Sequence, residues 1–464
     1  MVKALNTLPH PPAIPLLGNL HQVDLEKTHL QFEIWAKEYG PYFTVQLGPQ
    51  KVLVISELEG ILQALKDRPH DFQRTKKMQS IFSSMGILGV FTAEGEEWVK
   101  QRKLVMQSLN PQKIKNFLPH LRIVIERLKK LWMHEANKGD IFLPLPDLMS
   151  FTIDVTTQFA FGYDANTIEN SQDSIRNHIE VIFPIINQRL RALIPYWEFI
   201  KLPKDRLLDK SLIALNEFTE KLIAGFNKKN KENIITEPAN FLEALCLAAK
   251  DQSMSLNAQE VFANVLTMLL AGEDTTANVA AWATHLLALH PEVQNKIYEE
   301  VARELSGALP QNWQDLEKLK YTEGVALEAL RMKSAAPVLF LQPTKDVVIN
   351  DILVTKEVMI ITTTREVGMQ SQHFSEPEKF IPERWLVDNH EKAATANQKA
   401  FLPFGAGPRF CPGRNLSLVE LKYLLVMWAI EFEISLPNNQ TQPHEVFNFT
   451  MRPENLFIRL KKRN

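Results

Sequence analysis

The chain has 464 residues, of which 45% are apolar and 23% charged, so it can bury a large core and is not intrinsically disordered. Its formal net charge of −2 argues against a general nucleic-acid-binding protein. The two cysteines, Cys246 and Cys411, are too few for a disulfide scaffold or for a cysteine-rich zinc or iron–sulfur site.

Taken in chain order, the predicted elements form a mainly α protein with a smaller β region. Residues 1–20 contain a proline-rich arm, which cannot be helical throughout because proline disrupts helices. Helices are expected over about 26–39, over most of 96–300 and over 414–431. Strands are expected over 42–55, around a Gly48-Pro49 turn, and near 338–362. Two stretches are expected to be irregular: 363–410, and the lysine-rich segment 227–233, interpreted as a surface loop.

The hydropathy of the chain predicts a soluble protein. No stretch reaches the roughly 18 uncharged apolar residues that span a bilayer, and the first residues are too short and too polar for a signal peptide. We therefore expect a cytoplasmic location, in a reducing compartment; the alternative is a chain from which a membrane anchor has been removed, which would have the same hydropathy.

Glycines cluster around the second cysteine. Gly405, Gly407 and Gly413 flank Cys411, and Leu416 begins an apolar helical pattern just after it. Glycine permits positive φ and a close approach of the backbone to a bulky group. A cysteine at a helix N-terminus gains thiolate character, and Arg409 adds a nearby cation. The pattern indicates a thiolate suited to bind iron rather than a buried structural cysteine.

This segment resembles the haem-binding signature of the cytochrome P450 monooxygenases, with Phe404, Gly405, Gly407, Arg409, Cys411 and Gly413 at its fixed positions. The resemblance runs from the proline arm to the C-terminus. It implies the helical haem-binding fold of that family with a long central helix, and haem b as cofactor. Cys411 would be the iron ligand, and Arg409 would pair with a haem propionate.

A long central helix is predicted from a capping box at Asn257 and Glu260 to about His290, which at 1.5 Å per residue is roughly 50 Å. Its middle carries Gly272, Asp274 and Thr275, which are unfavourable in a buried helix. The Thr275 hydroxyl can compete for the carbonyl oxygen of Ala271 and open the helix locally.

That segment is similar to the oxygen-activating sequence of the same family. By resemblance, Thr275 would hydrogen-bond to dioxygen or to an ordered water at the haem, and Asp274 would relay protons. Because peroxide-using relatives typically lack this pair, its presence favours a true monooxygenase.

Three further motifs match the family. Glu328, Arg331 and Arg384 would form a buried charged network that supports the cysteine loop. Trp98 and Arg102, at i,i+4 spacing, would contact a haem propionate. The sequence departs from the usual pattern at three positions: Ser334 replaces a proline, Gln342 stands near the place of an arginine, and Thr364 replaces a histidine.

Partners follow from charge and from the resemblance. Residues 100–130 carry nine Lys or Arg against one acid, Glu126, in a chain that is nearly neutral. By resemblance these helices would receive an acidic ferredoxin or flavodoxin that works with its own reductase, although an ordinary solvated helix surface is the alternative. Since the chain shows no glycine-rich dinucleotide motif, we expect a single haem domain over 1–464 without a fused reductase, acting as a monomer.

The expected substrate is a hydrophobic small molecule, because the residues that would line its pocket are apolar. These are Leu88, Val90, Phe91, Ala271, Ala336 and Val338. The sequence thus predicts a soluble, bacterial-like monooxygenase that inserts one oxygen atom from O2 into such a molecule, with Asp274 and Thr275 as catalytic residues. The alternatives are a peroxide-driven peroxygenase or isomerase on the same fold and a non-enzymatic haem-binding sensor.

Overall fold

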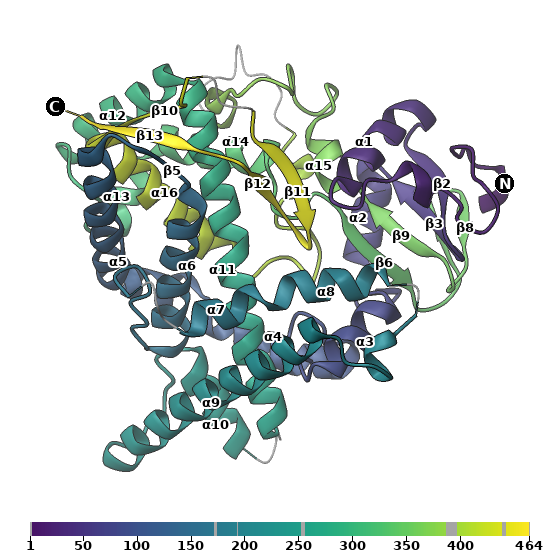
Figure 1. The fold of residues 1–464 in the computed structure, drawn as a ribbon, viewed down its shortest axis with the longest axis horizontal. Helices are drawn as coiled ribbons and strands as arrows, with labels where there is room; N and C mark the ends of the chain where they lie inside the picture. The colour runs from purple at the N-terminus through teal and green to yellow at the C-terminus, as the bar shows by residue number, and fades with distance from the viewer. Residues whose placement is uncertain are drawn as a thin grey trace. The chain divides into compact units, whose positions relative to one another are not determined.

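A computed structural model describes residues 2–170, 174–192, 194–251, 256–386, 397–438 and 442–463. They form two compact units (Figure 1). Unit 1 comprises Met1–Lys76, Gly324–Cys411 and Pro443–Glu454, and unit 2 comprises Lys77–Glu323, Pro412–Gln442 and Asn455–Asn464.

Unit 1 is built on a five-stranded sheet in the order β2-β3-β9-β6-β4. Its strands are β2 (Tyr42–Leu47), β3 (Gln50–Ile55), β4 (Phe72–Gln73), β6 (Leu339–Pro343) and β9 (Met359–Thr362). β3 and β9 are far apart in the sequence but pair in parallel, side by side in Figure 1. The run Val52–Ile55 is fully buried, as expected for an apolar central strand covered on both faces.

Unit 1 also contains a second sheet, a hairpin and several helices. A second sheet has the order β1-β8-β7, and β11 and β12 form an antiparallel hairpin. The helices are α1, α2, most of α14, and α15. The bounds are β1 (Lys3–Ala4), β7 (Val347–Ile349), β8 (Ile352–Val354), β11 (His444–Asn448), β12 (Thr450–Glu454), α1 (Thr28–Tyr39), α2 (Leu58–Lys66), α14 (Lys320–Met332) and α15 (Thr364–Gly368), with 3-10 turns η1 (Leu5–Thr7), η2 (Leu20–Gln22), η4 (Pro382–Trp385) and η5 (Gln398–Ala400).

Unit 2 is mainly helical, around the buried helix α11 (Ala258–Leu289). Its small sheet has the order β10-β13-β5. The other elements are α3 (Lys76–Ser84), α4 (Gly95–Ser108), α5 (Pro111–Lys138), α6 (Pro144–Phe161), α7 (Ser174–Glu180), α8 (Ile182–Arg191), η3 (Tyr196–Glu198), α9 (Pro203–Glu232), α10 (Phe241–Lys250), α12 (Pro291–Leu305), α13 (Trp313–Lys318), α16 (Arg414–Glu431), β5 (Ile141–Phe142), β10 (Phe432–Ser435) and β13 (Ile458–Lys462).

The mainly α composition with a smaller β region is confirmed. One local prediction was wrong, because the lysine-rich segment 227–233 is not a loop: α9 continues through it to Glu232. Cations near a helix C-terminus interact favourably with the helix dipole, and Lys229 also pairs with Glu243 at 2.7 Å. The predicted irregular stretch contains α15 and two 3-10 turns.

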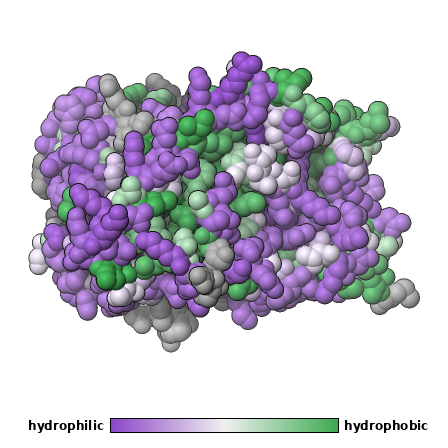
Figure 2. Space-filling view, turned by 90° about the horizontal axis from the view of Figure 1, so that it is seen from below, coloured by the Kyte–Doolittle hydropathy of each residue, from purple (hydrophilic) through white to green (hydrophobic). Residues whose placement is uncertain are grey.

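The surface is of an ordinary kind where Figure 2 shows it: mostly hydrophilic, with hydrophobic residues in scattered groups. Within the described ranges, no helix combines the length and the hydropathy that crossing a bilayer requires.

Candidate active site

The cysteine loop of unit 1 is held by backbone hydrogen bonds. The Cys411 amide donates to the Phe404 carbonyl at 2.9 Å, and the Phe410 amide donates to Gly407 at 3.1 Å. Gly405 and Gly407 both have φ of +69°, which glycine adopts without strain. The loop therefore presents the partly exposed Cys411 on a fixed backbone three residues before the first residue of α16.

The two loop glycines have different neighbours. A Cβ on Gly407 would lie 2.3 Å from the backbone oxygen of Leu65, so only glycine fits against the end of α2. A Cβ on Gly405 would meet no atom within 4 Å, so that face of the loop is open. The loop thus packs tightly at Gly407 and has open space next to Gly405.

The other cysteine is chemically different. Cys246 is buried in α10, and burial raises the pKa of its thiol to about 11. A thiol that resists deprotonation is a poor metal ligand. Of the two cysteines, Cys411 is therefore the candidate ligand.

In unit 2, α11 is continuous through its middle, so the expected local opening is absent there, but the expected hydrogen bond of Thr275 is present. The Thr275 hydroxyl donates to the Ala271 carbonyl at 2.8 Å. Ala271 is exposed and Thr275 half-buried, while the helix is buried over almost all of its remaining length. The helix begins at the predicted capping box, in which the Asn257 side chain accepts from the Glu260 amide at 3.0 Å.

A second acid in this turn was not singled out from the sequence. Glu273 is buried, and burial together with the neighbouring Asp274 raises the pKa of Glu273 well above its usual range. Its protonated form is thus favoured. Its backbone carbonyl accepts a hydrogen bond of 2.7 Å from the Thr152 hydroxyl on α6, which links the two helices at this turn. Asp274 is also buried.

The loop before α4 lies directly against α11. The Val90 amide donates to Asn264 Oδ1 at 3.0 Å, and a Cβ on Gly89 would lie 2.5 Å from the Ala263 carbonyl oxygen. Leu88 is exposed, and Val90 and Phe91 are half-buried. The structure thus brings three of the predicted pocket residues beside the helix that carries Ala271.

Trp98 and Arg102 lie one turn apart on α4, with Trp98 buried and Arg102 half-buried. The neighbouring Gln101 reaches from the same helix to the Leu88 carbonyl at 3.4 Å. α4 and the loop before it therefore form one packed group in unit 2.

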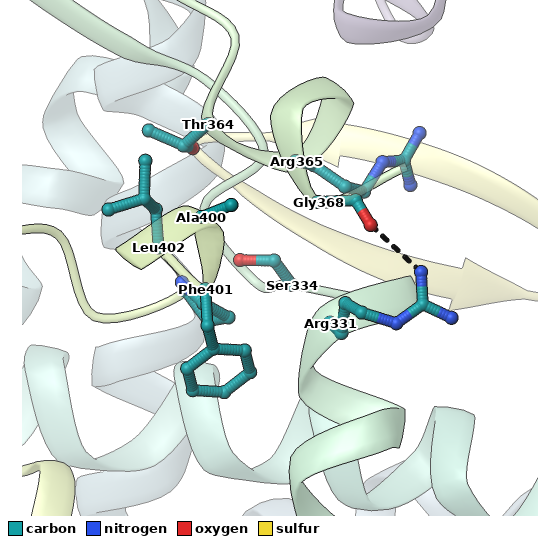
Figure 3. Close-up of a pocket in the computed structure, with 9 residues that line it drawn as sticks. Arg331, Ser334, Thr364, Arg365, Gly368, Ala400, Phe401 and Leu402 are labelled. Carbon is teal, nitrogen blue, oxygen red and sulfur yellow. Dashed lines mark hydrogen bonds between the residues drawn. The ribbon is translucent and has the colours of Figure 1, made fainter. Parts of the chain in front are cut away.

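The predicted charged residues of unit 1 form a buried network. Glu328 Oε1 accepts from Arg331 Nη2 at 2.7 Å and from Arg384 Nε at 2.9 Å. Its Oε2 accepts from Arg331 Nε at 3.0 Å and from the Trp385 indole at 2.9 Å. Arg331 also donates to the Gly368 carbonyl at 2.9 Å, as Figure 3 shows. The indole of Trp385 is a member of the network that no spacing rule could reveal.

The three departures from the family pattern have local explanations. Ser334 Oγ accepts from the Ala336 amide at 3.3 Å, a contact that proline could not make. Thr364 Oγ1 donates to the carbonyls of Ala336 and Pro337. Gln342 bridges two backbone groups, accepting from the Lys76 amide and donating to the Lys356 carbonyl, each at 3.1 Å.

Many of the basic side chains of residues 100–130 are engaged locally. Arg127 makes two 2.6 Å bonds to Asp164, and Lys129 pairs with Glu126 and Glu431. Lys113 donates to the Pro238 carbonyl, and Lys115 lies over the Trp313 ring. Lys100 pairs with Glu97. Lys103 and Lys130 are exposed. Acidic partners thus compensate the charges of Lys100, Arg127 and Lys129, whereas the contacts of Lys113 and Lys115 leave their charges in place.

Comparison with known proteins gives one consistent result. The family model for cytochrome P450 matches residues 8–460. The chain is 26% identical to cytochrome P450 27C1 of Danio rerio, over 96% of this chain and 84% of the relative. It is 26% identical to the protein LUTEIN DEFICIENT 5, chloroplastic, of Arabidopsis thaliana (86% and 68% covered), and 25% identical to a probable cytochrome P450 519E1 of Dictyostelium discoideum (98% and 93%). Because the match spans nearly the whole chain, this protein belongs to the cytochrome P450 family.

Proposed function

We propose that Cys411 supplies the thiolate that binds iron in the haem b of this monooxygenase. Family membership makes the chain a haem-thiolate monooxygenase that acts with redox partners. The observation that carries the assignment is the loop itself, in which a partly exposed cysteine stands on a fixed backbone beside the open face at Gly405.

The residues present fit a haem. The loop around the iron ligand would be shaped by Phe404, Gly405, Gly407 and Gly413. The buried thiol of Cys246 offers no competing ligand, because its pKa is raised. Cationic and indole donors suit the haem propionates, and we assign Arg409, Trp98 and Arg102 to them. We assign Glu328, Arg331 and Arg384 to folding and haem retention. Arg331 and Arg384 donate hydrogen bonds to backbone carbonyls of Gly368 and Ser375, in the segment that precedes the cysteine loop.

The haem, when bound, supplies the reductive activation of dioxygen. We assign proton delivery to Asp274 and Thr275 of this chain. Asp274 is a buried acid next to a hydroxyl that already holds the Ala271 carbonyl, so the turn has a hydrogen-bond donor that can be redirected. A positioned acid of this kind typically accelerates proton transfer by about 10²–10⁴-fold.

The substrate is proposed to be a hydrophobic small molecule. In unit 2, the proposed pocket residues lie on α11 or in the loop packed against it: Leu88, Val90, Phe91 and Ala271. In unit 1, the proposed pocket residues are two that follow α14 in the sequence, Ala336 and Val338. None of these side chains is charged, so they favour an apolar ligand and orient it by shape.

Electrons are proposed to come from an acidic ferredoxin or flavodoxin and its reductase. The exposed Lys103 and Lys130 would attract such a partner, in a manner that salt weakens. We further propose that residues 1–464 act as one haem domain and as a monomer, in a reducing compartment such as the cytoplasm, where a thiolate ligand is maintained.

Turnover with two oxidant systems tests the function. With a surrogate ferredoxin, its reductase and NADH, we expect oxygenated product in step with NADH consumption across a panel of apolar compounds. Turnover with hydrogen peroxide but never with NADH and O2 would instead identify a peroxygenase. Absence of turnover in both systems, with haem bound, would point to a sensor.

A further inference from the structure

A cluster of five charged or titratable side chains lies in unit 1, apart from the residues assigned above. Glu445 on β11 accepts from His29 Nε2 at 2.8 Å, from Arg365 Nη1 at 2.7 Å and from Lys333 Nζ at 2.5 Å. Arg365 also makes two 2.8 Å bonds to Glu33. We call these five residues the Glu445 cluster.

The Glu445 cluster is buried and joins elements that are distant in the sequence. His29 and Arg365 are buried, and the carboxylates of Glu33 and Glu445 are nearly so. Burial opposes the ionisation of Glu445, but His29, Arg365 and Lys333 more than offset it and hold its pKa well below the usual range. A buried anion with three donors ties β11 to α1, to α15 and to the residue just after α14.

The hairpin and α15, which the cluster joins, both donate hydrogen bonds to one short segment, 334–338. From the hairpin, the Met451 amide on β12 donates to the Ala335 carbonyl at 2.8 Å. From α15, Thr364 Oγ1 donates to the Ala336 and Pro337 carbonyls, both at 3.1 Å, and the Arg365 amide donates to Pro337 at 3.1 Å. Figure 3 shows Thr364, Arg365 and Ser334 around the pocket beside this segment.

We infer that Glu445 is a positioning residue for substrate selection. By fixing the β11–β12 hairpin and α15 to each other, it fixes the segment 334–338, because β12 and α15 both donate hydrogen bonds to carbonyl oxygens of that segment. The inference rests on the proposed function in one respect, the assignment of Ala336 and Val338 to the substrate pocket. The side-chain bonds of Glu445 given above go to His29, Lys333 and Arg365, so it acts through the backbone of the segment.

The test variant is Glu445→Gln, which keeps the shape of the side chain but removes its charge. The matched control is Glu454→Gln on the partner strand of the same hairpin, where Glu454 pairs with His444 at 2.6 Å on the surface. Hydrogen exchange of the haem-loaded protein is measured at the Met451 and Arg365 amides. We expect exchange on the order of tenfold faster in Glu445→Gln and unchanged in Glu454→Gln.

The dissociation constants of two haem ligands of different size measure the effect of Glu445→Gln on substrate selection. Imidazole is small and reports access to the iron alone, whereas 1-phenylimidazole also needs room in the apolar pocket. We expect the ratio of the two dissociation constants to shift by roughly fivefold or more in Glu445→Gln, about 1 kcal/mol, while Glu454→Gln keeps the wild-type ratio.

Unchanged exchange in Glu445→Gln overturns the inference, and so does faster exchange with an unchanged ligand ratio. Should that variant fail to take up haem, Lys333→Met, which removes one partner of Glu445, is judged by the same two criteria. If the carbon monoxide complex of the wild type lacks the thiolate spectrum, the proposed function is refuted instead. The hydrogen-exchange rates would then still show whether Glu445 holds the hairpin and α15 in place.

Discussion

At the scale of single residues, the environment decides which of two identical side chains can act. Cys246 and Cys411 have the same chemistry in isolation, but burial in α10 raises the pKa of Cys246 to about 11, whereas Cys411 lies partly exposed in a glycine loop. The sequence predicted this difference because glycine spacing is visible in it. The raised pKa of Glu273 was not predicted, because the burial that causes it depends on how α6 packs on α11.

The hydroxyl of Thr275 can be tested by Thr275→Ala. Without the hydroxyl that we assign to proton delivery, electrons should leave as hydrogen peroxide, and product per NADH consumed should fall on the order of tenfold. The measurement is peroxide and product formed per NADH with a surrogate ferredoxin. Thr284→Ala is the control, because the Thr284 hydroxyl also donates to a carbonyl of α11, that of Ala281. Tight coupling in Thr275→Ala would contradict the assigned role.

At the scale of elements, long elements with clear local signals were predictable and short ones were not. The capping box fixed the start of α11, and the β2–β3 hairpin followed from its apolar strands. The strands β10 and β13 span only four and five residues, and their pairing joins segments that are distant in the sequence, so no local pattern shows them. The continuation of α9 was missed because lysines suit both loops and helix ends.

The network around Glu328 should be essential for folding. Glu328→Gln leaves Arg331 and Arg384 buried with an incomplete partner, which costs about 3–5 kcal/mol of unfolding free energy. The measurement is urea denaturation followed by circular dichroism, together with haem content. Glu376→Gln removes an exposed i,i+3 pair with Lys379 in the same unit and should leave the midpoint unchanged. Equal midpoints for both variants would exclude a supporting role for the network.

The stability of α15 should depend on pH through Glu366. Burial, and then the charge of Glu33, raises the pKa of Glu366 from 4.5 to about 7. The folded state therefore binds this proton more tightly than the unfolded chain, and the resulting stabilisation, complete below pH 4.5, is lost as the pH rises through about 7.

Glu366→Gln removes that titration. Relative to the wild type, the variant should gain on the order of 2–3 kcal/mol of unfolding free energy between about pH 4.5 and pH 8. Urea denaturation at several pH values measures the difference. A difference that does not change with pH would show that Glu366 has an ordinary pKa in the folded protein.

At the scale of the whole molecule, the family and its cofactor were predictable because their motifs lie within short stretches of sequence, whereas the roles of the individual site residues stay predictions. The distribution of charge on the surface was less predictable from the sequence. The nine basic residues of 100–130 predicted a local basic region, with a solvated helix surface as the alternative, and Arg127 and Lys129 pair with acids outside that stretch as well as within it. The Glu445 cluster was invisible for the same reason, since Glu445 and His29 are 416 positions apart.

The proposed docking of an acidic partner can be tested at Lys103. Lys103→Glu should slow reduction by a surrogate acidic ferredoxin several-fold at low ionic strength, and the difference should shrink toward 0.5 M salt, where charges are screened within about 4 Å. Stopped-flow reduction under carbon monoxide gives the rate. Lys210→Glu, an exposed lysine on α9, is the control for net charge. The same slowing in both variants would show a general charge effect rather than docking at α4.

The central claim is that the thiolate of Cys411 binds the haem iron, and the absorption spectrum of the reduced carbon monoxide complex tests it most directly. The wild type should show the band at about 450 nm that marks thiolate ligation, and Cys411→His should lose that band while Cys246→Ser keeps it. A band that persists in Cys411→His, or a wild-type protein that binds hemin without it, would contradict the account.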